Sequence, residues 1–259
     1  MLSYTLFVAA TALLSLASAA PTPTVNETMI DRSLIQKRGF NCDSPVSGLN
    51  KADYEYMASI GILGQGVNAM SDSGRIWIGE GGPNTFTFKN DADGPLIVVL
   101  WDFPPSDYEA SFMNARHAAV SSSLPRKGDR VVVSLANGVS GGWSALVNQN
   151  TKLSQYGQID NTWGEFTTGN YATVDISREV NMRGTSMSVR TSGGCVSDMN
   201  RCVFVCKSGD KCGESGSYTL QDCQPGSQPG ANYWTDNVNA SGGCQAWSNG
   251  GHLEITLGN

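Results

Sequence analysis

The chain has 259 residues, of which 40% are hydrophobic and 15% charged, and it contains 30 glycines. The low charge and high glycine content argue against a helical bundle or coiled coil, and the hydrophobic fraction argues against a disordered chain. A formal net charge of −6 also disfavours a nucleic-acid partner, because phosphate binding needs a basic face. Sugars and other proteins remain as candidate partners.

The N-terminal segment has the pattern of a secretory signal. Residues 6–17 form an uncharged apolar run that is too short to span a membrane, and small residues follow it before Pro21. A polar stretch then ends at Lys37 and Arg38, a dibasic pair of the kind that kexin-type proteases cleave. We therefore expect no membrane span, a signal peptide over 1–20, a propeptide over 21–38 and one mature domain over 39–259.

Six of the seven cysteines are clustered near the C-terminus, which predicts a disulfide-rich lobe over 193–259. Because seven is odd, one cysteine stays free or pairs outside the chain, and a bridge from Cys42 to the lobe is one alternative. No metal ion and no cofactor are expected, because the cysteine spacing lacks paired ligand motifs and both histidines are isolated. The seven cysteines are Cys42, Cys195, Cys202, Cys206, Cys212, Cys223 and Cys244.

Two short helices are expected in the first third of the chain. Asn50 can cap a helix that ends before Gly61, and a second helix can start at Ser106 with Glu109 at capping-box spacing. Most other signals are short apolar or alternating strands separated by glycine turns, which is typical of an antiparallel β-sandwich. These strands are expected at 75–78, 85–88, 95–101, 130–135, 143–147, 162–167, 172–176, 187–190 and 253–257.

Two central stretches resemble the thaumatin-like proteins. The first is residues 121–133, with a leucine, a turn glycine and a strand, followed by the Gly-Trp strand at 137–143. The second is the Glu-Phe strand at 162–167, followed by the Asp-Ile-Ser of 174–177, then Asn181 and Cys195. The resemblance extends over roughly 95–206 and is strongest to small fungal secreted members, some of them candidate effectors. It implies an all-β, thaumatin-like antiparallel β-sandwich, mainly over 39–192, with the cysteine-rich lobe behind it.

Plant members of that family carry an acidic cleft that is associated with β-1,3-glucan binding and weak hydrolysis. The resemblance places Glu165 and Asp175 at two of the cleft acids, and these are the candidate catalytic residues. Glu179 comes one residue before the third acidic position, which Val180 occupies. The cleft arginine and the acid from the lobe have no counterpart, so the fold is better supported by the resemblance than the activity is.

Strand register decides whether the two acids can act together. A three-residue loop at 168–170 would pair Glu165 with Thr173 and make Asp175 a diagonal neighbour, about 7–8 Å away, within the spacing of an inverting carboxylate pair. A two-residue loop would turn Asp175 to the opposite face and leave no pair. The alternative to catalysis is that both acids face solvent or hydrogen-bond a loop.

Two tryptophans and one asparagine are candidate surface features. Trp234 and Trp247 lie in glycine- and asparagine-rich loops and are candidates for stacking on a glycan or partner, with packing inside the lobe as the alternative. Asn239 lies in a glycosylation sequon. No nucleophilic serine motif is present in a strand-to-helix context.

The sequence therefore predicts an extracellular, monomeric protein of the effector or elicitor type, or one that binds wall glycans, at a host or microbial surface. Its expected partner is a host extracellular protein or a cell-wall glycan. The alternatives are a weak β-1,3-glucan hydrolase and a structural wall component.

Overall fold

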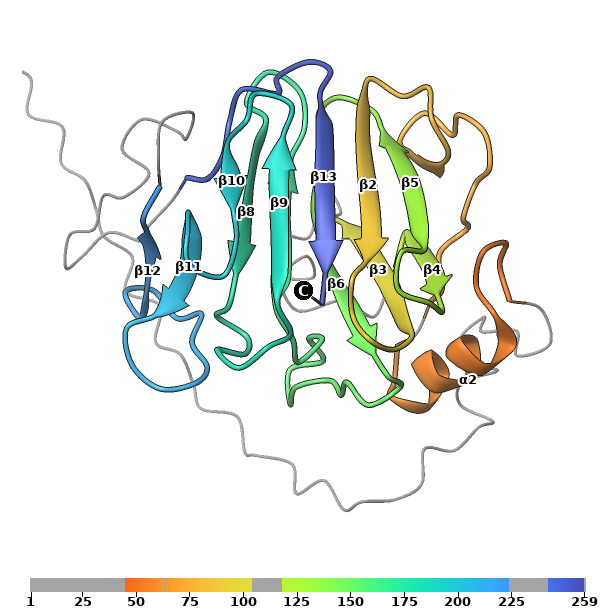
Figure 1. The fold of residues 1–259 in the computed structure, drawn as a ribbon, viewed down its shortest axis with the longest axis horizontal. Helices are drawn as coiled ribbons and strands as arrows, with labels where there is room; N and C mark the ends of the chain where they lie inside the picture. The colour runs from red at the N-terminus through yellow and green to blue at the C-terminus, as the bar shows by residue number, and fades with distance from the viewer. Residues whose placement is uncertain (1–44, 63, 104–117, 224–241, 259) are drawn as a thin grey trace, which may run out of the picture. The chain divides into compact units, whose positions relative to one another are not determined.

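A computed structural model describes residues 45–62, 64–103, 118–223 and 242–258 (Figure 1). All of them belong to the second of two units of the chain, Arg32–Asn259, whereas the first, Met1–Asp31, is outside the described residues. Several predictions also concern residues outside these ranges: the cleavage pair Lys37 and Arg38, Cys42, the helix expected from Ser106, Trp234 and Asn239.

Helix α2 spans Lys51–Ser59 and begins at the predicted cap. The Asn50 side chain accepts a hydrogen bond from the backbone N–H of Asp53 at 2.9 Å, and it donates to the Asp53 carboxylate at 2.7 Å. The first bond satisfies a backbone N–H that a helix start otherwise leaves open, and the second joins the two side chains. The same carboxylate accepts from Ser123 and Gln149, so the cap also ties α2 to the β-structure.

Within the described residues, thirteen strands form two sheets, which confirms the predicted all-β sandwich. The six-stranded sheet has the order β1-β5-β2-β13-β9-β10, and the seven-stranded sheet has the order β12-β11-β8-β7-β6-β3-β4. In Figure 1, β9, β13 and β2 lie in front of strands of the other sheet. The bounds are β1 Ile76–Ile78, β2 Asn84–Asn90, β3 Leu96–Asp102, β4 Val120–Leu124, β5 Arg130–Leu135, β6 Ser140–Val147, β7 Trp163–Thr167, β8 Thr173–Ser177, β9 Met187–Thr191, β10 Val196–Ser197, β11 Val203–Cys206, β12 Tyr218–Gln221 and β13 His252–Leu257.

The sandwich is mixed and not purely antiparallel, so that part of the prediction is wrong. β13 runs parallel to β2, and β11 runs parallel to β8. Both parallel pairs join strands that are distant in the sequence, which short hairpins cannot connect. The spacing of apolar runs predicts where the strands lie in the sequence. It does not predict whether a strand pairs parallel or antiparallel with its neighbour in the sheet.

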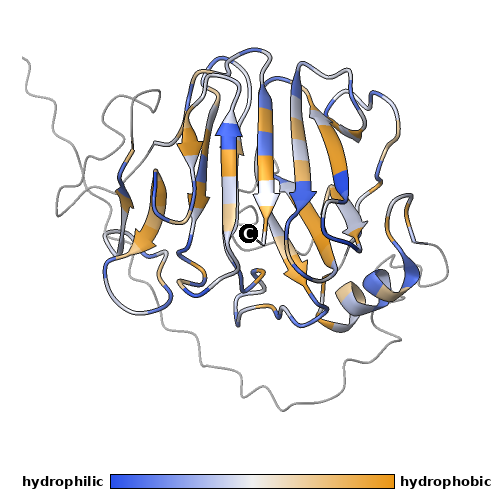
Figure 2. Ribbon diagram, viewed as in Figure 1, coloured by the Kyte–Doolittle hydropathy of each residue, from blue (hydrophilic) through white to orange (hydrophobic). Residues whose placement is uncertain are grey.

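The main core lies between the two sheets. Along β2 buried and partly exposed residues alternate, and β2 and β13 show the corresponding hydropathy bands (Figure 2). Phe86 of β2 packs edge-to-face against Phe166 with ring centroids 5.0 Å apart, and against Trp143 at 5.8 Å. Such aromatic contacts stabilise the core beyond simple area burial.

A second apolar cluster covers the outer face of the seven-stranded sheet. Outward side chains of β3, including Val99 and Trp101, pack with Trp163 of β7 and with Tyr54 and Met57 of α2. Residues 96–101 of β3 are therefore all buried, which explains the uninterrupted apolar run that the sequence shows there.

The sequence did not predict four strands. β4 has the sequence Val-Ser-Ser-Ser-Leu. Its buried Ser121 is polar, so the strand lacks the apolar pattern by which buried strands are predicted. The Asn68 side chain bonds the Ser121 backbone on both sides, accepting from its N–H and donating to its C=O. The other three strands, β10, β11 and β12, lie in the disulfide-rich lobe.

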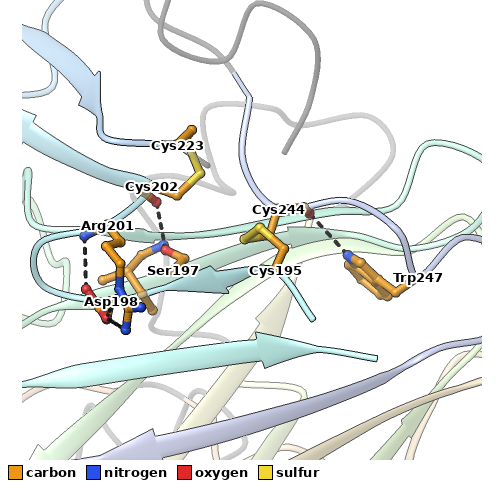
Figure 3. Close-up of a disulfide and its surroundings, with 9 residues drawn as sticks. Cys195, Ser197, Asp198, Arg201, Cys202, Cys223, Cys244 and Trp247 are labelled. Carbon is orange, nitrogen blue, oxygen red and sulfur yellow. Dashed lines mark hydrogen bonds and ion pairs between the residues drawn. A yellow bond between two sulfur atoms is a disulfide. The ribbon is translucent and has the colours of Figure 1, made fainter. Parts of the chain in front are cut away.

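Three disulfides connect the six C-terminal cysteines, as predicted, and Figure 3 shows two of them. They are Cys195–Cys244, Cys202–Cys223 and Cys206–Cys212. The expected alternative of a bridge from Cys42 to the lobe is therefore wrong, because every lobe cysteine already has a partner within the lobe. Among the described residues, no helix is long and apolar enough to cross a membrane.

Candidate functional site

Strands β7 and β8 form a hairpin that brings the two candidate acids together. The last pair of the ladder is Thr167 with Thr173, so the loop has five residues, 168–172, and the three-residue expectation is wrong. The reason is Thr168, whose hydroxyl accepts from the Val139 N–H at 2.8 Å and holds the loop against the β5–β6 connection. A five-residue loop preserves the parity of a three-residue loop, so both acids remain on one face.

Glu165 and Asp175 are direct cross-strand partners and not diagonal neighbours. Directly opposed residues have Cβ atoms about 4.5–5.5 Å apart, closer than the diagonal distance considered for an inverting pair. Both acids lie on the same face of the sheet as Trp163, the face that α2 covers in part. Asp175 is buried at 6% exposure, whereas Glu165 is half-buried.

Glu179 joins the pair and completes what we call the acidic cluster: Glu165, Asp175 and Glu179. Burial raises the pKa of Glu165 to about 7. Burial and then the charge of Glu165 raise the pKa of Glu179 to about 8, against the effect of a hydrogen bond to Ser177. Burial, followed by the charges of Glu165 and Glu179, raises the pKa of Asp175 well above its ordinary value.

The sequence left the third acid undecided between Glu179 and the position of Val180. Val180 is buried in the apolar cluster on the α2 side, and Glu179 interacts with the other two acids. Strand alternation could have identified Glu179 from the sequence. Residues 175, 177 and 179 share a face if the alternation of β8 continues past its end.

No positive side chain neutralises the acidic cluster within the described ranges. Arg178, its neighbour in sequence, donates instead to the backbone carbonyls of Met199 and Met182. On the β6 side, Glu165 is opposite Gly142, and a Cβ at that glycine would lie 2.8 Å from the indole of Trp101. Trp101 therefore occupies the space beside Gly142, and burial together with the neighbouring acids accounts for the upward pKa shifts.

One oxygen of the acidic cluster is buried without a hydrogen-bond partner in the described part of the chain. Oδ1 of Asp175 lacks any donor. An unpaired buried acceptor costs free energy, and such atoms in native proteins commonly mark a place for a water, an ion or a ligand. Groups of three or more side chains placed to hold a metal ion are absent from the described residues.

Trp247 is not an exposed platform, so that prediction is wrong. It is 2% exposed, its indole N–H donates to the Cys244 carbonyl at 3.3 Å, and its ring packs on Phe86 at 5.9 Å. The disulfide at Cys244 fixes the following loop over the core, which draws the ring inward (Figure 3). Packing inside the lobe, the alternative reading, is therefore correct for Trp247.

The chain is similar to solved structures and matches one sequence family. Among solved structures, the chain is similar to the thaumatin-like xylanase inhibitor TLXI, at 11% identity and a TM-score of 0.30, over 66% of this chain and 97% of that one. It is also similar to the protein elicitor MoHrip2 from Magnaporthe oryzae, at 11% identity and a TM-score of 0.27, over 68% of this chain and 99% of the other. A thaumatin-like protein is thus among its structural neighbours, although likenesses this distant say nothing about activity.

Sequence comparison gives a more definite result. No curated protein sequence matches the chain. Residues 82–213, about half of the chain, match the family model described as the Allergen Asp f 4-like domain. That region contains strands β2 to β11 and all three members of the acidic cluster. The chain therefore belongs to the Asp f 4-like allergen family.

Proposed function

We propose that this protein is secreted and binds a neutral cell-wall polysaccharide of the β-1,3-glucan type at the acidic cluster, without cleaving it. The observation that carries the proposal is the buried Oδ1 of Asp175, an acceptor without a donor, directly opposite a second carboxyl group. Glu165 is the half-buried member of the pair, so a sugar hydroxyl would reach the pair through Glu165.

The protonation of the acidic cluster supports a neutral, polyhydroxylated ligand. With pKa values of about 7 for Glu165 and about 8 for Glu179, these carboxyl groups are mostly protonated in a mildly acidic medium. A protonated carboxyl group both donates and accepts hydrogen bonds, as a sugar hydroxyl does. A cationic ligand would instead require the ionised form that burial disfavours.

The absence of a positive side chain beside the acidic cluster, within the described residues, bears on the alternative function, a β-1,3-glucan hydrolase that uses Glu165 and Asp175. Glycoside hydrolysis needs one protonated and one ionised carboxyl group, so the two pKa values must be pushed apart. Here burial raises all three pKa values, and no described arginine or lysine lowers one of them. No described positive side chain therefore holds one of these carboxyl groups in the ionised form that the second role in hydrolysis requires.

Secretion is part of the proposal. The three disulfides are typical of proteins that fold in an oxidising compartment. They are in line with the signal peptide and the dibasic cleavage site that we expect from the sequence. N-terminal sequencing of protein from the culture medium should therefore begin at Gly39. A mature chain that starts at Pro21 would show that residues 21–38 are not a propeptide.

A pull-down at pH 5 tests the binding site. Insoluble β-1,3-glucan, chitin and cellulose are incubated with wild type, Asp175→Ala, and the control Glu80→Gln, which changes an exposed acid. We expect wild type and the control to be retained on β-1,3-glucan, and Asp175→Ala to be lost from it while it keeps its melting temperature. Equal retention of all three proteins would place binding elsewhere on the molecule.

A further inference from the structure

A polar groove lies on the other side of the sandwich, on the outer face of the six-stranded sheet. Its floor is formed by outward side chains of β9 and β13, and its wall by the 198–201 loop that follows β10. Its volume is about 370 Å³, within the range of about 300–1,000 Å³ found for small-molecule sites. The acidic cluster is on the seven-stranded sheet, so the two sites share no residue.

The wall of the groove is held rigidly by disulfides at both ends. Residues 196–201 lie between Cys195 and Cys202, which are both buried and bonded to distant partners (Figure 3). Inside the loop, Asp198 accepts from the backbone N–H groups of Asn200 and Arg201 at 2.9 Å and pairs with the Arg201 guanidinium. The loop is therefore preformed, and a ligand would not have to order it.

The floor of the groove presents one guanidinium without a counterion. Arg190 is directly opposite Glu254 in the β9–β13 ladder, but the closest ion-pair contact of Glu254 is His252, at 3.5 Å. None of the ion pairs within the described residues includes Arg190. Arg201, by contrast, is neutralised by Asp198.

Uncommitted hydroxyl groups lie beside this guanidinium. Ser188 and Thr256 are opposite each other one step along the same two strands, and both line the groove with Arg190. Their hydroxyls make no hydrogen bond to another described residue. Guanidinium groups bind carboxylates through two parallel hydrogen bonds, and serine and threonine hydroxyls both donate to and accept from sugar hydroxyls.

We propose that this groove binds an acidic sugar, a uronic acid unit whose carboxylate pairs with Arg190 and whose ring hydroxyls bond Ser188 and Thr256. Glu254 lies opposite Arg190, and its negative charge weakens the binding of anions. It therefore limits the site to ligands with one carboxylate. The overall negative charge of the protein acts in the same direction against a long polyanion. The groove thus favours a single unit or chain end over an extended acidic polymer.

Titrations followed by amide NMR shifts test this assignment with matched ligands and variants. The ligands are galacturonate, its neutral methyl ester, and galactose. Wild type should bind galacturonate, with shifts confined to 186–190, 196–201 and 254–256, and should bind the two neutral sugars at least tenfold more weakly. Absence of galacturonate binding, or equal binding of the methyl ester, would overturn the proposal.

Three substitutions then separate charge from shape. Arg190→Gln should weaken galacturonate binding about tenfold, the usual effect of losing a charged hydrogen bond. Glu254→Gln should strengthen it about twofold to fivefold by removing the opposed charge. Arg126→Gln, an exposed arginine in the turn before β5, should change nothing. Unchanged binding of galacturonate in Arg190→Gln, or weaker binding in Glu254→Gln, would contradict the assignment. These variants leave the acidic cluster untouched, so their result is independent of the glucan-binding proposal.

Discussion

Glu165 and Asp175 face each other directly across strands β7 and β8, half-buried and buried, on the face of the sheet that α2 covers in part. Two opposed carboxyl groups in a poorly solvated place cannot both ionise without cost, and Glu179 adds a third acid to the same place. The protonation of this acidic cluster links the stability of the sandwich to pH and decides what the site can bind.

Stability should fall as pH rises from about 4.5 to about 8. The folded protein holds protons on Glu165 and Glu179 up to pH values near 7 and 8, whereas in the unfolded chain these groups release them near pH 4.5. The folded state therefore binds more protons across this window, and the free energy of unfolding decreases with rising pH. Asp91 and Asp198, whose pKa values are lowered, change stability only at more acidic pH.

Melting temperatures measured from pH 4 to pH 9 test this, with Glu165→Gln as the informative variant. Glutamine cannot ionise, so the decline between pH 5 and pH 8 should become shallower. Glu80→Gln, an exposed control, should keep the wild-type slope. A wild-type melting temperature that rises over this range would contradict the raised pKa values.

The three disulfides should contribute unequally to stability. In the chain-entropy view, a bridge stabilises more when it closes a longer loop. Cys195–Cys244 spans 49 residues and should contribute about 4 kcal/mol, whereas Cys206–Cys212 spans 6 and should contribute about 2 kcal/mol. Double alanine variants of each pair, unfolded in urea, would show this order, and the reverse order would contradict it. Peptide mapping of the wild type should also find Cys42 outside all three bridges.

Trp247 should act on stability rather than on ligand binding. Trp247→Ala removes a buried ring that contacts Phe86 and should lower the free energy of unfolding by about 3–5 kcal/mol. Tyr171→Ala, which removes an aromatic ring that is 83% exposed, is the matched control and should cost almost nothing. Denaturant titration checks both, and a Trp247→Ala protein as stable as the control would mean that the ring does not pack as described.

The Asp53 carboxylate should be the main attachment of α2 to the sheet. It accepts from Asn50 at 2.7 Å, Ser123 at 2.6 Å and Gln149 at 2.8 Å, and the residue is 3% exposed. Asp53→Ala leaves these donors without an acceptor and should cost about 1–3 kcal/mol. Glu55→Gln, at an exposed position of the same helix, should leave the urea midpoint unchanged. A loss equal to that of the control would show that packing alone holds the helix.

Much of the fold could be predicted because its strands carry clear apolar patterns, an alternation in β2 and an uninterrupted run in β3. The prediction failed where polar residues are buried against specific partners: Ser121 of β4 is bonded by Asn68, a residue 53 positions away. It also failed at the β7–β8 loop, whose length depends on the hydroxyl of Thr168 and its distant backbone partners. Local patterns contain no information about such contacts.

The candidate site was partly predictable for the same reason. The resemblance identified Glu165 and Asp175, but only the register shows that they are direct partners and that Glu179 lies with them. Trp247 was misread because its glycine-rich surroundings suggested an exposed loop, whereas the disulfide at Cys244 fixes it over the core.

Binding and cleavage of β-1,3-glucan can be measured in one experiment that tests the proposed function. Wild type is incubated with laminarin at pH 5, retained protein is measured by affinity electrophoresis, and released reducing ends are assayed against a boiled control. We predict retardation by laminarin with no reducing ends above the control. Release of reducing ends that disappears in both Glu165→Gln and Asp175→Asn would show that the acidic cluster is catalytic and would contradict the proposed function.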